Sequence, residues 1–139
     1  MNIRMATTEE SISAIKDTAE KYFTKGMLKE ALLAYEKIKP HTGKEPRISL
    51  RIGDIYRKMG KNQEAVEAYK LAANAFIEQG FVTKAIGVCK IIIDIDPSQE
   101  TIQKKIAELY TQKGFVAEGA GQPPLPSTIE EKKAATETG

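Results

Sequence analysis

Apolar residues recur every three to four positions along most of the chain, which is the spacing of one face of an α-helix. No stretch alternates in the manner of a β-strand for more than a few residues. Six apolar stripes can be followed, at about residues 12–22, 28–38, 48–59, 63–79, 82–93 and 102–110. The pattern therefore predicts an all-α domain of about six helices.

Glycines mark where several of these helices should end. Gly26, Gly60, Gly80 and Gly114 each follow an apolar stripe, where a residue that tolerates positive φ commonly closes a helix. The β-branched segment 91–95 could pass for a strand. Because it lies between an apolar stripe and an Asp-Pro pair, we expect it to be the end of a helix.

Polar residues predict how two helices begin. Thr7 and Glu10 have the spacing of a capping box for the first helix. Asp96, Pro97 and Gln99 predict an N-cap, a first-turn proline and a reciprocal side chain for the last helix.

The four glycines lie 34, 20 and 34 residues apart, and the residues around them repeat. The set Tyr22, Gly26, Ala31 and Tyr35 is matched by Tyr56, Gly60, Ala65 and Tyr69, and then by Phe76, Gly80, Ala85 and Cys89. A period of 34 residues with paired helices indicates stacked hairpins, because one hairpin cannot bury its own apolar face.

In these residues the sequence resembles the tetratricopeptide repeat (TPR) family, over about residues 12–116. The resemblance implies a right-handed superhelix of antiparallel helix hairpins. The small residues that let two helices approach closely fall on Ala19, Gly53, Ala73 and Ala107 in first helices, and on Ala31, Ala65 and Ala85 in second helices. The segment 80–97 is similar to bacterial versions of the repeat.

Two features depart from a regular array. The 20-residue step between Gly60 and Gly80 leaves no room for a separate helix to open the third repeat. One continuous fourth helix, about 17 residues long, is expected to close one repeat and open the next, with a kink in the superhelix there. The first repeat ends in an eight-residue connection, residues 39–46, instead of a tight turn.

Length and composition predict one helical repeat domain with a tail. The chain has 139 residues, of which 41% are hydrophobic and 29% charged. We expect residues 1–117 to form the repeat domain and residues 118–139, which contain proline and glycine, to be a disordered tail or linker. No apolar run is long enough to cross a bilayer and the start lacks an apolar signal core, so a cytoplasmic protein without membrane contact is expected.

Little in the sequence supports catalysis. Cys89 is the only cysteine and is expected to be a buried, inert thiol, and His41 is the only histidine and is expected at the surface. Phosphate loops, dinucleotide fingerprints and zinc spacings are not found. We therefore expect no enzyme, no metal and no cofactor. The formal charge of +2 is too small to predict a nucleic-acid partner.

The TPR resemblance also implies a binding surface. In the family, the first helices of successive hairpins line a concave face that holds a peptide. The residues that match those lining positions are Lys16, Glu20, Arg47, Leu50, Arg51, Asp54, Arg57 and Asn74, with Ser13, Lys70, Lys104 and Glu108 as further members.

Charge on this surface suggests the chemistry of the partner. The cations Lys16, Arg47, Arg51 and Arg57 favour an acidic peptide or a free carboxylate. Glu20 stands where chaperone-binding members of the family carry an asparagine. Because an acid there would repel a terminal carboxylate, a chaperone-tail clamp is not expected.

Two function classes are favoured over a third, a helical nucleic-acid binder that uses the net charge of +4 on residues 1–117. The first is a protein-interaction adaptor or scaffold that holds a partner peptide or helix on the concave face. The second is an oligomerisation or structural module, in which the last helix and Phe115-Val116 pack against another copy or a regulatory domain.

Overall fold

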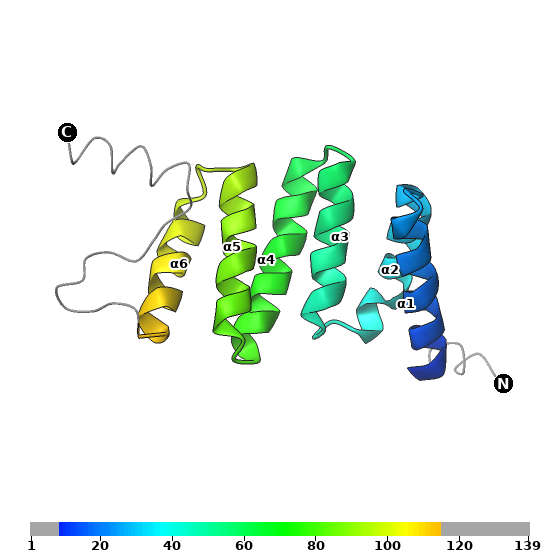
Figure 1. Ribbon diagram of the computed structural model, residues 1–139, viewed down its shortest axis with the longest axis horizontal. Helices are drawn as coiled ribbons and strands as arrows, with labels where there is room; N and C mark the ends of the chain where they lie inside the picture. Colours follow the sequence, from blue (N-terminus) through cyan, green and yellow to red (C-terminus); the bar gives the residue numbers. More distant parts are fainter. Residues whose placement is uncertain (1–8, 115–139) are drawn as a thin grey trace. The chain divides into compact units, whose positions relative to one another are not determined.

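In a computed structural model of the chain, residues 9–114 can be described (Figure 1). Their elements are α1 (Glu9–Thr24), α2 (Leu28–Ile38), the short 3₁₀ helix η2 (Lys39–His41), α3 (Pro46–Lys58), α4 (Asn62–Glu78), α5 (Val82–Ile95) and α6 (Glu100–Gln112). The prediction of an all-α fold with about six helices is confirmed. Thr7 of the predicted capping box, Phe115-Val116 and the predicted tail lie outside the described residues.

The helices follow one another as antiparallel pairs, α1 with α2, α3 with α4 and α5 with α6 (Figure 1). By its internal contacts the chain divides within α4 into two compact units, one ending at Ala68 and the other beginning at Tyr69. The first unit contains the α1–α2 pair and α3, which packs against α2. The second contains the α5–α6 pair. The superhelical path of the pairs stays a prediction.

The helix ends at the four repeated glycines have the conformation that the sequence predicts. Gly26, Gly60, Gly80 and Gly114 have φ between +79° and +85°. At Gly26, the N–H of Met27 donates to the Tyr22 carbonyl at 2.8 Å, and the N–H of Gly26 donates to the Phe23 carbonyl at 3.0 Å. This is the Schellman motif, in which a left-handed residue lets the chain cap the carbonyls that the helix leaves unpaired.

The motif also explains the aromatic residue four positions before Gly80. In a Schellman turn, the residue after the glycine commonly makes an apolar contact with the residue four positions before the glycine. Phe81 makes this contact with Phe76, edge to face, with ring centroids 6.2 Å apart. Lys84 lies over both rings, with its Nζ 5.9 Å from the Phe76 centroid and 5.2 Å from that of Phe81. Phe76 therefore stabilises the turn at Gly80 as well as the core.

Small residues lie at the buried positions between paired helices. Ala19 of α1 and Ala31 of α2 have no exposed surface, and the same holds for Ala65 and Ala85. The core of the first unit comprises Ala19, Ala31, Tyr35, Ile38, Ile48, Ile52, Ile55 and Ala68. Complete burial of an alanine leaves no space for a larger side chain, as the TPR resemblance implies.

The long fourth helix and the helical end of α5 are confirmed. α4 runs without a break for 17 residues, from Asn62 to Glu78. α5 continues through the β-branched segment to Ile95. No helix within residues 9–114 combines the length and the apolar character that a membrane span requires.

The prediction that Asp96 caps the last helix is wrong. α6 begins at Glu100 with Gln99 as its N-cap, and Asp96 is the C-cap residue of α5. The Asp96 carboxylate instead accepts hydrogen bonds from the Ser98 N–H at 3.1 Å, the Ser98 hydroxyl at 2.6 Å and the Gln99 amide at 3.0 Å. These bonds stabilise the turn at Pro97. Because α6 begins at Glu100, Pro97 lies before the helix and not in its first turn.

Candidate functional site

Side chains of α1 and α3 meet at an ion pair in the first unit. The Arg51 guanidinium of α3 donates from Nε to Glu20 Oε1 at 3.2 Å and from Nη2 to Glu20 Oε2 at 2.9 Å. Its third nitrogen, Nη1, donates to Asp54 Oδ2 at 3.1 Å. Arg51 therefore joins the two carboxylates that occupy the same position in successive 34-residue repeats, Glu20 and Asp54.

Two aromatic side chains complete this cluster. The Tyr35 hydroxyl of α2 donates to Glu20 Oε1 at 2.7 Å. The Arg51 guanidinium carbon lies 4.3 Å from the Phe23 ring centroid, within the range of a cation–π contact. Below, the Arg51 cluster means Phe23, Glu20, Tyr35, Arg51 and Asp54, which come from α1, α2 and α3.

The cluster changes the acidity of its members. The hydrogen bond from Tyr35 and the nearby charge of Arg51 hold the pKa of the Glu20 carboxyl below its ordinary value of 4.5, although burial acts in the opposite direction. Burial, together with the carboxylate of Glu20, raises the pKa of Tyr35 to about 12. Near neutral pH Glu20 is therefore ionised and Tyr35 is a hydrogen-bond donor.

A second ion pair joins α1 to the loop before α3. Lys16 Nζ lies 3.0 Å from Glu45 Oε1, and both side chains are partly exposed. Lys16 and Arg51, which the sequence predicts as ligand-binding cations, thus have carboxylate partners within the chain. Exposed pairs of this kind contribute little to stability.

The other predicted lining residues of the first unit lie along α3. Arg47 and Arg57 are exposed and Leu50 is partly buried. At 100° per residue they share one face of α3 with Arg51 and Asp54. Ser13 is exposed on α1.

The remaining predicted positions belong to the second unit. Asn74 is exposed on α4, where Lys70 is partly buried, and Lys104 and Glu108 are exposed on α6. The structure thus brings Glu20, Arg51 and Asp54 into direct contact. The use in binding of Asn74, and of every other predicted lining residue, stays a prediction.

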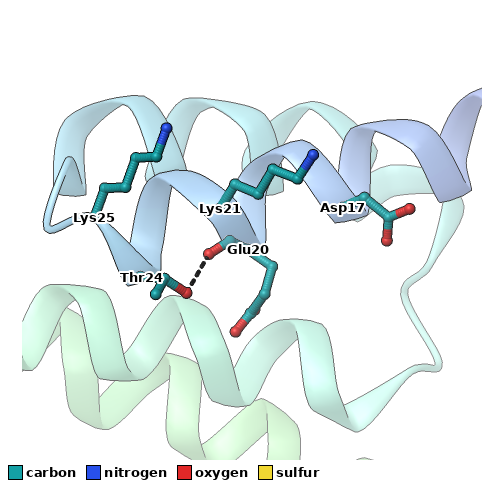
Figure 2. Close-up of a pocket in the computed structure, with 5 residues that line it drawn as sticks. All are labelled: Asp17, Glu20, Lys21, Thr24 and Lys25. Atoms are coloured by element: carbon teal, nitrogen blue, oxygen red, sulfur yellow. Dashed lines mark hydrogen bonds between the residues drawn. The ribbon is translucent and has the colours of Figure 1, made fainter.

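A surface hollow of about 410 Å³ runs along α1, lined by Asp17, Glu20, Lys21, Thr24 and Lys25. Figure 2 shows the Glu20 side chain directed away from the ammonium groups of Lys21 and Lys25. The Thr24 hydroxyl donates to the Glu20 backbone carbonyl at 2.8 Å, so it is used within the helix. Glu20 is thus shared by the hollow and the Arg51 cluster.

Sequence reasoning missed three members of these contacts. The repeat identifies Tyr35 only as a recurring aromatic residue, and the sequence pattern predicts no role for Phe23 or Glu45. Phe23 lies next to the repeated aromatic Tyr22. The signal that could have identified it is Arg51, a cation three residues before Asp54 on α3, because an arginine on a neighbouring helix can stack on an aromatic ring. Glu45 offered no periodic signal, because it lies in the connection between repeats.

Residues with potential chemistry of their own are placed as expected. Cys89 is buried, and burial raises the pKa of its thiol to about 11. His41 is exposed at the end of η2. Among residues 9–114, no three histidine, cysteine or acidic side chains lie close enough together to hold a metal ion.

Comparison with known proteins supports the family resemblance for one part of the chain. Residues 46–75 match the family model of the tetratricopeptide repeat. The match covers α3 and most of α4, which the 34-residue period assigns to the second repeat. No curated protein matches the chain.

Several solved structures are similar to the chain. The first TPR of Spaghetti (RPAP3), bound to the HSP90 peptide SRMEEVD, has 15% identity and a TM-score of 0.45, with coverage of 76% of this chain and 97% of that one. The MamA protein has 20% identity and a TM-score of 0.42, with coverage of 78% and 67%. The second TPR domain of human RPAP3, in complex with the HSP70 peptide SGPTIEEVD, has 16% identity and a TM-score of 0.42, with coverage of 68% and 91%.

Proposed function

We propose that this chain is a non-enzymatic protein-interaction module, an adaptor that holds a partner peptide or helix on the polar face of α1 and α3. The observation that carries the proposal is the Arg51–Glu20 ion pair. It joins side chains from the first helices of two successive repeats, which the resemblance assigns to one lining face. The tetratricopeptide match over residues 46–75 supports the same reading, because this repeat is a stacking and binding unit.

The partner is proposed to be acidic along α3. Arg47 and Arg57 are exposed on the same helical face, and partly buried Leu50 lies between them. Arginine favours carboxylates because its planar guanidinium can donate two parallel hydrogen bonds. A central apolar contact at Leu50 with charged residues around it is a common interface pattern.

The test is an affinity measurement on the full chain. A partner is first captured by pull-down, identified by mass spectrometry and purified. Its dissociation constant is then measured for wild type and for the triple variant Arg47→Ala, Leu50→Ala, Arg57→Ala. We expect affinity to fall by about tenfold or more, since interface cores concentrate the binding energy.

A matched control uses cations on the other helix of the first hairpin. Lys29 and Lys37 are exposed on α2, and the double variant Lys29→Ala, Lys37→Ala also removes two positive charges. Its affinity should stay within about twofold of wild type, because rim and remote charges contribute little. Equal losses in the two variants would overturn the proposal.

The alternative, self-association through the last helix, has weaker support. The exposed side chains of α6 are all polar or charged: Glu100, Thr101, Lys104, Glu108, Thr111 and Gln112. A polar outer face is typical of the helix that ends a repeat array in solvent. Sedimentation of the full chain as a monomer would count against the alternative.

A further inference from the structure

We propose that Glu20 is a specificity residue of the α1–α3 face, because its carboxylate occupies Arg51 and denies that arginine to the carboxylates of a partner. The inference refines the proposed function, since it states which cation on the face an acidic partner does not use. It changes the expectation drawn from the sequence, in which Arg51 belongs to the cations that favour an acidic peptide.

The geometry occupies the side of Arg51 at which a carboxylate can pair with Nε and Nη2 together. Nε and Nη2 donate to the two oxygens of Glu20, and Nη1 donates to Asp54, so every guanidinium nitrogen has a carboxylate partner. One flat side of the guanidinium lies on the Phe23 ring. An incoming carboxylate that paired with Arg51 in the same two-point manner would have to displace Glu20.

Displacement is unfavourable for two reasons. Glu20 is tethered by α1 and by its Tyr35 hydrogen bond, so it competes at the effective concentration of an intramolecular group, which is on the order of millimolar or above. A partner present at micromolar concentration is far more dilute. In addition, Glu20 and Asp54 both carry negative charge beside Arg51, and like charges disfavour an approaching carboxylate.

The sequence context shows that the two acids are a repeated feature. Glu20 and Asp54 lie 34 residues apart and hold the same position on α1 and α3. Arg51 lies one helical turn before Asp54 and reaches across to Glu20. The arginine is therefore shared between equivalent acids of neighbouring repeats, and removing either charge should release part of its binding capacity.

The experiment measures a gain of binding, so it does not need the natural partner. The probe is a fluorescein-labelled peptide, Gly-Ser-Gly-Asp-Glu-Glu with a free C-terminus, and its binding to the full chain is followed by fluorescence anisotropy at low ionic strength. Glu20→Gln keeps the shape of the side chain and its ability to accept from Tyr35 but removes the charge. We expect this variant to bind the probe about tenfold more tightly than wild type, the gain of one charge-assisted contact.

Three controls separate release of Arg51 from a simple change of net charge. Asp17→Asn removes one negative charge from the same helix and the same hollow, and it should change probe affinity by no more than about twofold. Adding Arg51→Gln to Glu20→Gln should return affinity to the wild-type level. A probe in which glutamine and asparagine replace the acids, with an amidated end, should gain nothing.

Folding of each variant is checked by its circular dichroism melt. If Glu20→Gln does not fold, Asp54→Asn tests the same claim, because it removes the negative charge that Nη1 contacts and leaves the bond between Tyr35 and Glu20 in place. The expected gain is then smaller, about threefold. No gain in a folded variant, or an equal gain with Asp17→Asn, would overturn the inference.

The outcome is distinguishable from failure of the proposed function. If the α3 triple variant keeps its affinity for the natural partner while Glu20→Gln gains probe binding, the adaptor proposal fails and the role of Glu20 stands. If the triple variant loses the partner while Glu20→Gln gains nothing, the adaptor proposal stands and the role of Glu20 is wrong.

Discussion

The Tyr35 hydroxyl donates its hydrogen bond to the same Glu20 oxygen that accepts from Arg51 Nε, so one carboxylate on α1 connects α2 and α3. The two bonds differ in length, 2.7 Å from Tyr35 and 3.2 Å from Arg51. Both favour the ionised form of Glu20. The contact between the first and second repeats is therefore linked to one titrating group.

This linkage predicts a stability change at acid pH. Because the pKa of Glu20 is lowered on folding, its contribution is present above its ordinary pKa of 4.5 and is lost as pH falls through the folded value. Glu20→Gln should lower the free energy of unfolding at pH 7 by about 0.5–1 kcal/mol, a modest value because the pair is half exposed. The difference from wild type should shrink at pH 3.

Urea unfolding at the two pH values measures this effect. Asp17→Asn on the same helix serves as the control and should stay within about 0.5 kcal/mol of wild type at pH 7. A Glu20→Gln deficit that is as large at pH 3 as at pH 7 would show that packing, not charge, is responsible.

Two glycines near α5 should respond in opposite ways to the same substitution. Gly87 lies inside the helix, is exposed, and a Cβ there would meet no neighbouring atom. Gly87→Ala should stabilise by about 0.5–1 kcal/mol, because alanine loses less backbone entropy in a helix. Gly80 has φ +84°, and Gly80→Ala should destabilise by about 1–2 kcal/mol despite the open space around it.

Thermal melts of the two variants test this contrast. The opposite signs are the informative result, since both changes add one methyl group to an exposed glycine. If Gly80→Ala melted at or above the wild-type temperature, the left-handed turn would not be a requirement of the fold.

The buried alanines between paired helices should not accept larger side chains. Ala65→Leu and Ala85→Leu introduce three carbon atoms where the alanine has no exposed surface, and each should destabilise by about 1–3 kcal/mol. Lys104→Ala on the exposed face of α6 should change stability by no more than about 0.5 kcal/mol. Denaturant midpoints that are equal for all three variants would contradict the repeat alignment.

Cys89 should react slowly in the folded protein. It is 1% exposed and the pKa of its thiol is raised to about 11, so little thiolate is present at pH 8. Reaction with Ellman's reagent should be about a hundredfold faster in guanidinium chloride than in buffer, from the change in thiolate fraction alone. Because the chain has one cysteine, the signal reports this site directly. Similar rates in the two solvents would show that the thiol is accessible in the native state.

The polar contacts show where reasoning from sequence reached its limit. The repeat alignment places Glu20, Asp54 and Arg51 on one predicted face. It does not say that the arginine pairs with Glu20, which is 31 residues away on another helix. Asp96 is a local example. The residues Asp96, Pro97 and Gln99 fit the start of a helix, but they fit equally well a turn that precedes the helix, which is where the structure places Asp96.

The sequence by itself determined the helices, the positive-φ glycine turns, the continuous fourth helix and the burial of the small residues other than Ala107, which is partly buried. These features follow from periodicity and from backbone preferences that act within a few residues. Only the tertiary structure decided that Glu20, Tyr35 and Arg51 share one contact, and that Lys16 pairs with Glu45. Long polar side chains can reach several neighbours, and their partners depend on distances between helices that the residue pattern does not encode.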